Sequence, residues 1–256
     1  MLIILSPTKI QNFKDKSVTA QHSLPENIHE SQKLVKLIRK LSPAELGKLL
    51  DINNQLTQLN FDRFFNWHFP FTLQNAKQAV LVFDGEVFRG LNAKSFSEED
   101  FEYAQQHLRI LSGLYGILKP LDLIQPYRLE VSSKLVNDKG KDLYAFWENS
   151  ITKSIDKAIK ASGEPQVLIN LASDEYFKSI NSKLLKHKKI IHIEFWQYKD
   201  DKYKQIVIYT KKARGLMASF IIKNKIEDVE MLKGFAEDRY WYSPQMSTEK
   251  KLVFIR

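Results

Sequence analysis

Residues 2–9 have the sequence LIILSPTK, in which four apolar residues are followed at once by Ser6, Pro7, Thr8 and Lys9. The apolar run is typical of a short buried strand. The polar residues follow at its carboxyl end, which is where open α/β sheets hold their ligands. The sequence therefore predicts a buried first strand and, directly after it, a loop placed to bind a ligand.

Further apolar runs predict more strands at 80–83 and 167–173, and a hairpin of 188–198 with 203–210. Helices are expected at 31–41 and 142–162, and one is expected to begin at 211. Two more helices are expected after the capping boxes that start at Ser42 and Ser97. Because helices and strands alternate irregularly, we expect an α+β fold with a mixed sheet rather than a doubly wound fold. Residues 1–256 are expected to form a single compact domain.

The composition excludes several classes of protein. Hydrophobic residues make up 43% of the 256 residues, which is enough for a packed core and excludes a mainly disordered chain. The chain has no cysteine, so disulfides, thiolate metal sites and cysteine nucleophiles are excluded. No apolar stretch approaches the ~20 residues that span a bilayer, and no secretory leader is apparent. We expect a soluble cytoplasmic protein that does not bind membranes.

Positive charge is concentrated in one part of the chain. The formal net charge is +9, and residues 134–225, with 19 basic and 10 acidic side chains, account for all of it. Single lysines of this kind often lie on solvated helix faces. A regional excess instead favours an anionic partner, because like charge destabilises a compact state unless an anion compensates for it.

Common catalytic and metal-binding signatures are absent, including GxGxxG, Walker A, HExxH and GxSxG. The six histidines show no paired ligand spacing, and His68 is expected to pack within the aromatic core segment 61–71. Asp84 and Glu86 flank Gly85 and are compatible with acid–base chemistry, although an Asp-Gly turn is the simpler explanation of these residues. We expect no metal site and no cofactor.

The strongest functional pattern is a set of basic residues beside turns and helix ends. Backbone amides and guanidinium groups that meet in one cleft bind phosphates well. We expect such a cleft, and its predicted residues are Lys9, Arg109, Arg128, Lys178, Lys211, Lys212 and Arg214. Aromatic residues near these positions are candidate stacking faces unless they belong to the core, namely Tyr115, Tyr127, Tyr176 and Trp196.

The segment 98–121 has two interpretations. A helix from Ser97 followed by Gly113-Leu114-Tyr115-Gly116 resembles a helix-hairpin-helix, whose hairpin amides hold a DNA backbone. Gly113 and Gly116 would then be DNA-binding residues. Alternatively, the two glycines only end a helix that runs through Leu111.

Four motifs together resemble the bacterial YaaA family of peroxide-stress-resistance proteins. They are LSPTK at 5–9, LRILSGLYGILKPLDLIQPYRLE at 108–130, NLASDEYFK at 170–178 and KKARGLMASFII at 211–222. The resemblance implies the fold described for that family as cantaloupe-like, with a helix-hairpin-helix element. It also implies a positively charged cleft, DNA binding, and a role in limiting peroxide damage that is linked to lowered unincorporated iron.

The expected function is therefore non-enzymatic binding of double-stranded DNA with little sequence preference. The alternative is an enzyme that acts on a nucleotide or a nucleic-acid lesion, with Lys9 or Lys178 as nucleophile or Asp84 and Glu86 as acid and base. Iron sequestration is the weakest alternative because the chain offers no clustered ligands. The oligomeric state stays open.

Overall fold

A mixed β-sheet forms the centre of the molecule, in a computed structural model that describes residues 1–256. Its strand order is β4-β3-β1-β6-β7-β10-β9, and β8 pairs with β7. The five strands from β3 to β10 in this order run parallel, whereas β4, β8 and β9 are antiparallel to their neighbours. A separate pair joins β2 to β5. The strands are β1 (Leu2–Leu5), β2 (Lys77–Gln78), β3 (Leu108–Ser112), β4 (Gly116–Leu118), β5 (Leu123–Ile124), β6 (Val167–Leu171), β7 (Lys189–Lys199), β8 (Lys202–Lys204), β9 (Trp241–Tyr242) and β10 (Lys251–Ile255).

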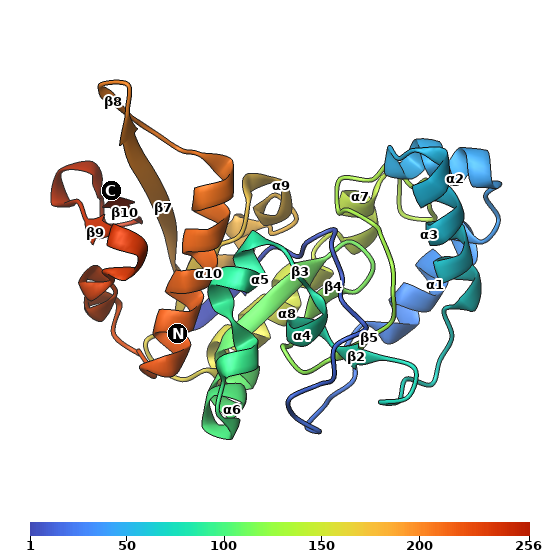
Figure 1. Cartoon of the computed structure of the whole chain (residues 1–256), viewed down its shortest axis with the longest axis horizontal. Coiled ribbons are helices and arrows are strands. Elements are labelled where there is room, and N and C mark those ends of the chain that lie inside the picture. Colours follow the sequence, from blue (N-terminus) through green and yellow to red (C-terminus); the bar gives the residue numbers. More distant parts are fainter.

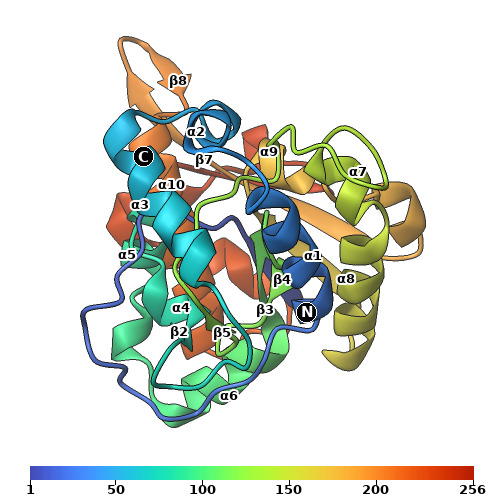
Figure 2. The ribbon, with the colours of Figure 1, turned by 90° about the vertical axis from the view of Figure 1, so that its right-hand side faces the viewer.

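The helices gather around this sheet and at one end of it. The group α1–α3 lies at one end of the long axis and the strands β9 and β10 lie at the other (Figure 1). The second view shows the same group in front of the sheet (Figure 2). Not one of the helices has both the length and the apolar character needed to span a membrane. The helices are α1 (Ile28–Ile38), α2 (Pro43–Leu50), α3 (Asn54–Asn66), α4 (Ala79–Val82), α5 (Glu86–Leu91), α6 (Glu98–His107), α7 (Leu143–Trp147), α8 (Ser150–Ala161), α9 (Asp174–Phe177) and α10 (Val207–Lys223).

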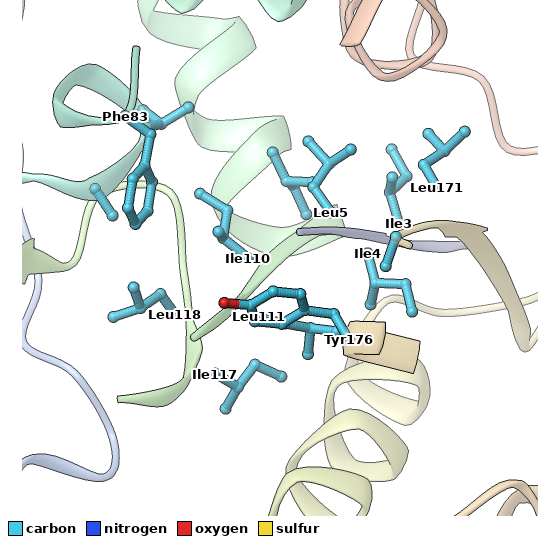
Figure 3. Packing of buried hydrophobic residues seen from close by; sticks show 14 of the residues in the cluster. Ile3, Ile4, Leu5, Phe83, Ile110, Leu111, Ile117, Leu118, Leu171 and Tyr176 are labelled. Carbon is cyan, nitrogen blue, oxygen red and sulfur yellow. The ribbon is translucent and has the colours of Figure 1, made fainter. Parts of the chain in front are cut away.

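Strand β1 is buried along its whole length, as its apolar sequence predicts. Ile3 and Leu5 pack with Ile110 of β3 and Leu171 of β6 in the core cluster (Figure 3). This cluster joins 71 buried residues, from Met1 to Phe254. An α+β fold with a mixed sheet is therefore confirmed.

Local sequence motifs define several helix starts correctly. The capping boxes at Ser42 and Ser97 both form, and each serine side chain accepts a hydrogen bond from the N3 backbone amide. Ser173 is the N-cap of α9. The helix expected at 142–162 is present as α7 and α8, which are separated at Glu148 by a positive φ of 42°.

The strand expected at 80–83 is wrong, because this stretch is the short helix α4 followed by Phe83. All four residues of α4 are buried, and a short run of uniform burial has no periodicity that separates a helix from a strand. The second strand of the hairpin is shorter than predicted. It covers Lys202–Lys204 rather than 203–210, and α10 begins at Val207 instead of 211.

The aromatic segment 61–71 is only partly core. Phe64, Trp67 and Phe71 are buried, but His68 is exposed and Phe65 is 71% exposed. The reason is that α3 ends at Asn66 and lies at the edge of the molecule, so that one of its faces meets solvent.

The structure does not have the predicted helix-hairpin-helix at 98–121. Helix α6 ends at His107, and the chain continues as β3, a tight turn and β4. The turn that contains Gly113 and Gly116 therefore joins two antiparallel strands. The hydrophobic residues at 108, 110 and 111 are buried in the interior of the sheet. This tertiary packing outweighs the helical sequence pattern that continues through Leu111.

Candidate functional site

A cavity of about 430 Å³ opens at the carboxyl edge of β1 and β6. This is the edge at which the LIILSPTK motif predicts a ligand. We call this cavity the basic pocket. It is lined by Ser6–Gln11 after β1, by Gly85–Val87 and Arg89 at α5, by Tyr127–Glu130, by Leu171, Ser173, Glu175 and Tyr176 around α9, and by Lys211 and Arg214 of α10.

The floor of the basic pocket is a contact between the loops that follow β1 and β6. The Ser173 amide donates a hydrogen bond of 2.9 Å to Ser6 Oγ, and the two serine hydroxyls lie 3.1 Å apart. Because β1 and β6 are paired in register over four residues, they bring these loops to the same level. The contact leaves Thr8 and Lys9 free to face the cavity.

Helix α10 places Lys211 and Arg214 in the pocket by packing closely against α5. Gly215 of α10 and Gly90 of α5 face each other, and a β-carbon at Gly215 would overlap the carbonyl oxygen of Val87. Two glycines are needed here because the backbones of the two helices touch. The first turn of α5, with Glu86 and Arg89, thereby comes to line the same cavity.

Two arginines are the most unusual groups in the pocket. The Nε atoms of Arg128 and Arg214 are buried and have no hydrogen-bond partner. Burial lowers the pKa of Arg214, in spite of the nearby carboxylates of Asp174 and Glu194. The backbone before Arg128 is fixed because the Tyr127 amide donates to Gln11 Oε1 at 3.1 Å and its hydroxyl lies 2.7 Å from Ser112 Oγ.

Acidic side chains lie opposite these cations. Glu130 is half-buried, and burial raises its pKa although Lys9 and Arg128 oppose this effect. Glu175 accepts a hydrogen bond of 2.6 Å from Ser132 Oγ. Glu86 pairs with Arg89 at 2.9 Å. The pocket lining has five cationic and three anionic side chains, a formal excess of two positive charges.

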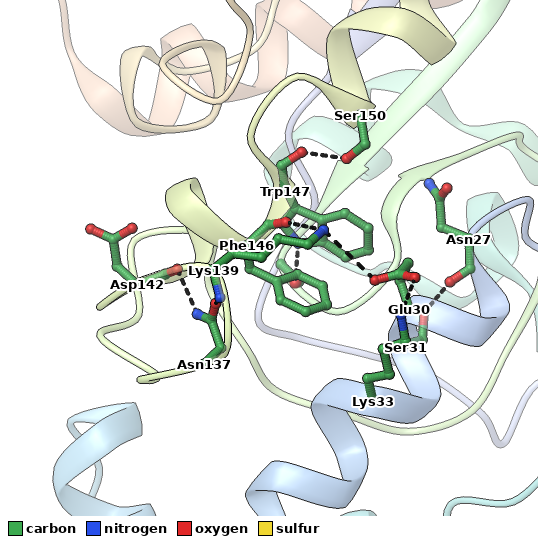
Figure 4. Close-up of polar contacts among 11 residues, drawn as sticks. Asn27, Glu30, Ser31, Lys33, Asn137, Lys139, Asp142, Phe146, Trp147 and Ser150 are labelled. Carbon is green, nitrogen blue, oxygen red and sulfur yellow. Dashed lines mark hydrogen bonds and ion pairs between the residues drawn. The ribbon is translucent and has the colours of Figure 1, made fainter.

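A wider groove of about 1070 Å³ adjoins the basic pocket and shares Lys9, Glu130 and Glu175 with it. Its walls are α2 and residues 132–136. The segment that follows this second wall is tied to α1, because Lys139 Nζ donates to the Phe146 carbonyl at 3.0 Å and lies 3.9 Å from Glu30 (Figure 4). The groove carries equal numbers of basic and acidic side chains, so the positive excess belongs to the pocket.

The structure brings together four of the predicted basic residues, because Lys9, Arg128, Lys211 and Arg214 all line the pocket. Our expectation that all the predicted cations converge is wrong. Lys212 lies 3.6 Å from Asp238, and Lys178 lies over the ring of Tyr144 at 5.2 Å; neither lines the pocket.

Arg109 is the clearest exception. Its position in β3 buries the side chain, and Nη1 donates to the carbonyls of Gln105, Gln106 and Leu108 at the end of α6. A cation at a helix carboxyl end stabilises the helix dipole. This geometry gives Arg109 a structural role.

Gly113 and Gly116 also lie away from the cavity surface. Gly116 has a φ of 71°, and a β-carbon there would lie 2.9 Å from the Trp147 ring. Trp147 Nε1 in turn donates to the Gly113 carbonyl at 2.9 Å. Leu114 and Tyr115 between them are fully buried, so the turn has no exposed surface at these residues.

Sequence reasoning singled out Glu86 but missed the other two acidic residues of the pocket. Glu130 and Glu175 lie within the quoted motifs, but no spacing rule singles out a lone glutamate in a loop. Of the candidate stacking residues, Tyr115, Tyr127 and Tyr176 are buried and belong to the core. Trp196 is half-buried and lies outside the pocket.

No group of three or more histidine, cysteine, aspartate or glutamate side chains is arranged to hold a metal ion.

The chain was also compared with models of known protein families. A family model described as peroxide stress protein YaaA matches residues 1–246, which include every residue of the basic pocket. The chain therefore belongs to the peroxide stress protein YaaA family.

Proposed function

We propose that this member of a peroxide stress family binds DNA through the sugar–phosphate backbone, with one phosphate held in the basic pocket. We further propose that DNA bound in this way is protected from iron-dependent oxidative damage. The family membership supports the stress role. The excess of cationic side chains in the basic pocket supports a phosphate as the ligand.

The observation that carries this proposal is the pair of unpartnered Nε–H groups of Arg128 and Arg214. A buried donor without an acceptor costs about 1–3 kcal/mol, and more when the group is charged. A phosphate supplies several acceptor oxygens and matches the planar guanidinium group well. One phosphate between the two arginines would satisfy both donors.

The size and charge of the pocket support a single nucleotide unit. Ligand cavities of about 300–1,000 Å³ hold small molecules, and this one has about 430 Å³. Its formal excess of two positive charges suits one or two phosphates. Because the cations contact phosphates and not base edges, binding is expected to show little sequence preference.

The test is a titration of duplex DNA with the wild-type protein and two variants of α10. Arg214→Gln should weaken binding about ten-fold or more and reduce the slope of log K against log salt by about one. Lys212→Gln, two residues away and outside the pocket, is the matched control and should change both quantities less. Equal effects of the two variants would show that binding reflects general positive charge and not the pocket.

Protection is tested with supercoiled plasmid exposed to ferrous iron and peroxide. Wild-type protein should slow nicking, and Arg214→Gln should protect less at the same concentration. Equal protection by both proteins would show that protection of the plasmid does not depend on DNA binding at the basic pocket.

A second candidate function is an enzyme that acts on damaged DNA. The observation that favours it is the position of Lys9 beside the half-buried carboxyl group of Glu130 in one cavity. An amine there is placed to condense with the aldehyde of an abasic site, with loss of water. Borohydride would then trap a covalent protein–DNA adduct that Lys9→Gln abolishes. If no adduct forms, DNA binding without catalysis remains as the proposed function.

A further inference from the structure

The groove that adjoins the basic pocket differs from it in charge and in lining. It is lined by four lysines and four acidic side chains, so it carries no formal net charge. Its apolar lining residues are Leu37, Leu41, Leu49, Leu50, Leu135 and Val136. Val136 is 71% exposed, and three of the leucines are only half-buried, so apolar surface faces the groove. A neutral, partly apolar groove does not suit a continuous sugar–phosphate backbone, which follows positively charged grooves.

Two carboxylates lie where the pocket meets the groove, because Lys9, Glu130 and Glu175 line both. Glu130 is half-buried and takes part in none of the molecule's ion pairs. The Glu175 carboxylate accepts one hydrogen bond, from Ser132 Oγ. A carboxylate accepts several hydrogen bonds and repels a phosphate. The junction therefore favours an uncharged part of a ligand that carries hydroxyl groups.

The site thus has three chemical environments in a fixed order. The unpartnered Nε–H groups of Arg128 and Arg214 belong to the pocket and not to the groove. The two carboxylates come next, and the aliphatic walls of the groove lie beyond them. A nucleoside monophosphate has the matching order of phosphate, sugar hydroxyls and base. Carboxylates are established acceptors for ribose hydroxyls, and apolar side chains line most small-molecule sites.

We propose that the basic pocket and the groove together bind a free ribonucleotide. Its phosphate lies at the two arginines, its ribose hydroxyls at the two carboxylates, and its base in the groove. A sugar inside a DNA strand has no free hydroxyl to donate, so DNA satisfies only the arginines. The proposal rests on the proposed function only in placing a phosphate at Arg128 and Arg214, and it adds that nucleotide and DNA compete for the pocket.

Calorimetric titration tests this assignment with the four ribonucleoside 5′-monophosphates and with ribose 5-phosphate, which lacks a base. At least one nucleotide should bind about ten-fold or more tightly than ribose 5-phosphate. Its 2′,3′-dideoxy counterpart, which lacks both hydroxyl donors, should bind about five-fold or more weakly. The proposal is overturned if no nucleotide binds more tightly than ribose 5-phosphate, or if the dideoxy counterpart binds equally well.

Glu130→Gln tests the carboxylate at the junction. The neutral amide is a weaker acceptor, so the preference for the ribonucleotide over its dideoxy counterpart should fall about three-fold or more. This ratio cancels the general effect of a lost negative charge on phosphate binding. Glu86→Gln is the matched control, because Glu86 lines the pocket but not the groove, and it should leave the ratio unchanged. Equal ratios in wild type and Glu130→Gln would contradict the assignment of the hydroxyls.

Val136→Asn tests the position of the base. It should weaken nucleotide binding about three-fold or more and leave ribose 5-phosphate binding unchanged. Val18→Asn, at another exposed valine outside the pocket and the groove, should change neither. Circular dichroism establishes that each variant is folded. Unchanged nucleotide affinity in Val136→Asn would place the base outside the groove and overturn the proposal.

The outcomes distinguish this proposal from the proposed function. If Arg214→Gln weakens duplex binding but no nucleotide binds more tightly than ribose 5-phosphate, the nucleotide site is wrong and DNA binding at the pocket stands. If a ribonucleotide binds with a preference that Glu130→Gln reduces, while Arg214→Gln leaves duplex binding unchanged, the nucleotide site stands and the proposed function is wrong. When both hold, the nucleotide should displace duplex DNA from the protein.

Discussion

At the scale of single residues, charged groups that look alike in the sequence have different roles. Arg128 and Arg214 keep buried Nε–H groups without partners, whereas Arg109 uses its guanidinium group on the carbonyls at the end of α6. The sequence places Lys9, Arg128, Lys211 and Arg214 correctly at the site, although Lys211 and Arg214 lie within α10 and not at its start. It misplaces Arg109 because the distinction depends on where α6 ends, which is decided by packing and not by a local motif.

Asp122 provides a prediction about pH. Burial raises its pKa to about 6, although Ser23 Oγ and the Lys119 amide both donate hydrogen bonds to the carboxylate. Between about pH 4 and pH 6 the native state therefore holds a proton that the unfolded chain has lost, so this group's contribution to stability falls as the pH rises. Asp122→Asn cannot titrate. Its stability relative to wild type should increase by roughly 2–3 kcal/mol from pH 4 to pH 7.

Urea unfolding at several pH values measures this difference. Asp138→Asn, at an exposed aspartate, is the control and should follow the wild-type profile. A difference between Asp122→Asn and wild type that stays constant with pH would show that the carboxyl group is not perturbed in the native state.

At the scale of secondary-structure elements, helices with capping motifs and the buried strands β1 and β6 are predictable, whereas two other short buried segments are not. The starts of α2 and α6 follow from Ser42 and Ser97, because a capping box is a local interaction. The nature of 79–82 and 108–112 could not be predicted, since all residues of both are buried and neither has a polar face. For the same reason the helix-hairpin-helix resemblance was misleading.

The contact between α5 and α10 positions both walls of the pocket, and it depends on Gly215. Gly215→Ala would place a methyl group against the Val87 carbonyl, so we expect a loss of about 3 kcal/mol or more of stability. Gly234→Ala is the matched control, because a β-carbon there meets nothing within 4 Å, and its effect should stay within about 0.5 kcal/mol. Thermal unfolding of both variants compares them. Similar small effects would show that the two helices can move apart.

The turn between β3 and β4 is expected to be structural. Gly116→Ala combines a positive φ with a close approach to the Trp147 ring, and should cost roughly 2 kcal/mol. Because Leu114 and Tyr115 are buried, the DNA affinity of the folded fraction should be unchanged. A duplex titration with circular dichroism as the folding control measures both. Weaker binding by folded Gly116→Ala protein would restore a DNA-binding role for this turn.

At the scale of the whole molecule, the parallel direction of the central strands gathers the functional groups at one edge. The loops after β1 and β6, the beginning of α5, Lys211 and Arg214 of α10, and the segment 127–130 meet there, although they are distant in sequence. The basic region 134–225 contributes α9, the β7–β8 hairpin and α10 to this edge. The sequence predicted this charge and the presence of Lys9 and Arg128 in one cleft, and the sheet order shows how these distant segments come together.

The central claim is that a phosphate of DNA lies between Arg128 and Arg214. The most direct test records the arginine Nε–H resonances of the protein by NMR, assigned with Arg128→Lys and Arg214→Lys variants, while short duplex DNA is added. We predict that the Nε–H signals of Arg128 and Arg214 both shift as DNA saturates the protein, because each gains an anionic acceptor. Saturation of the protein with DNA while both signals stay unchanged would contradict the account.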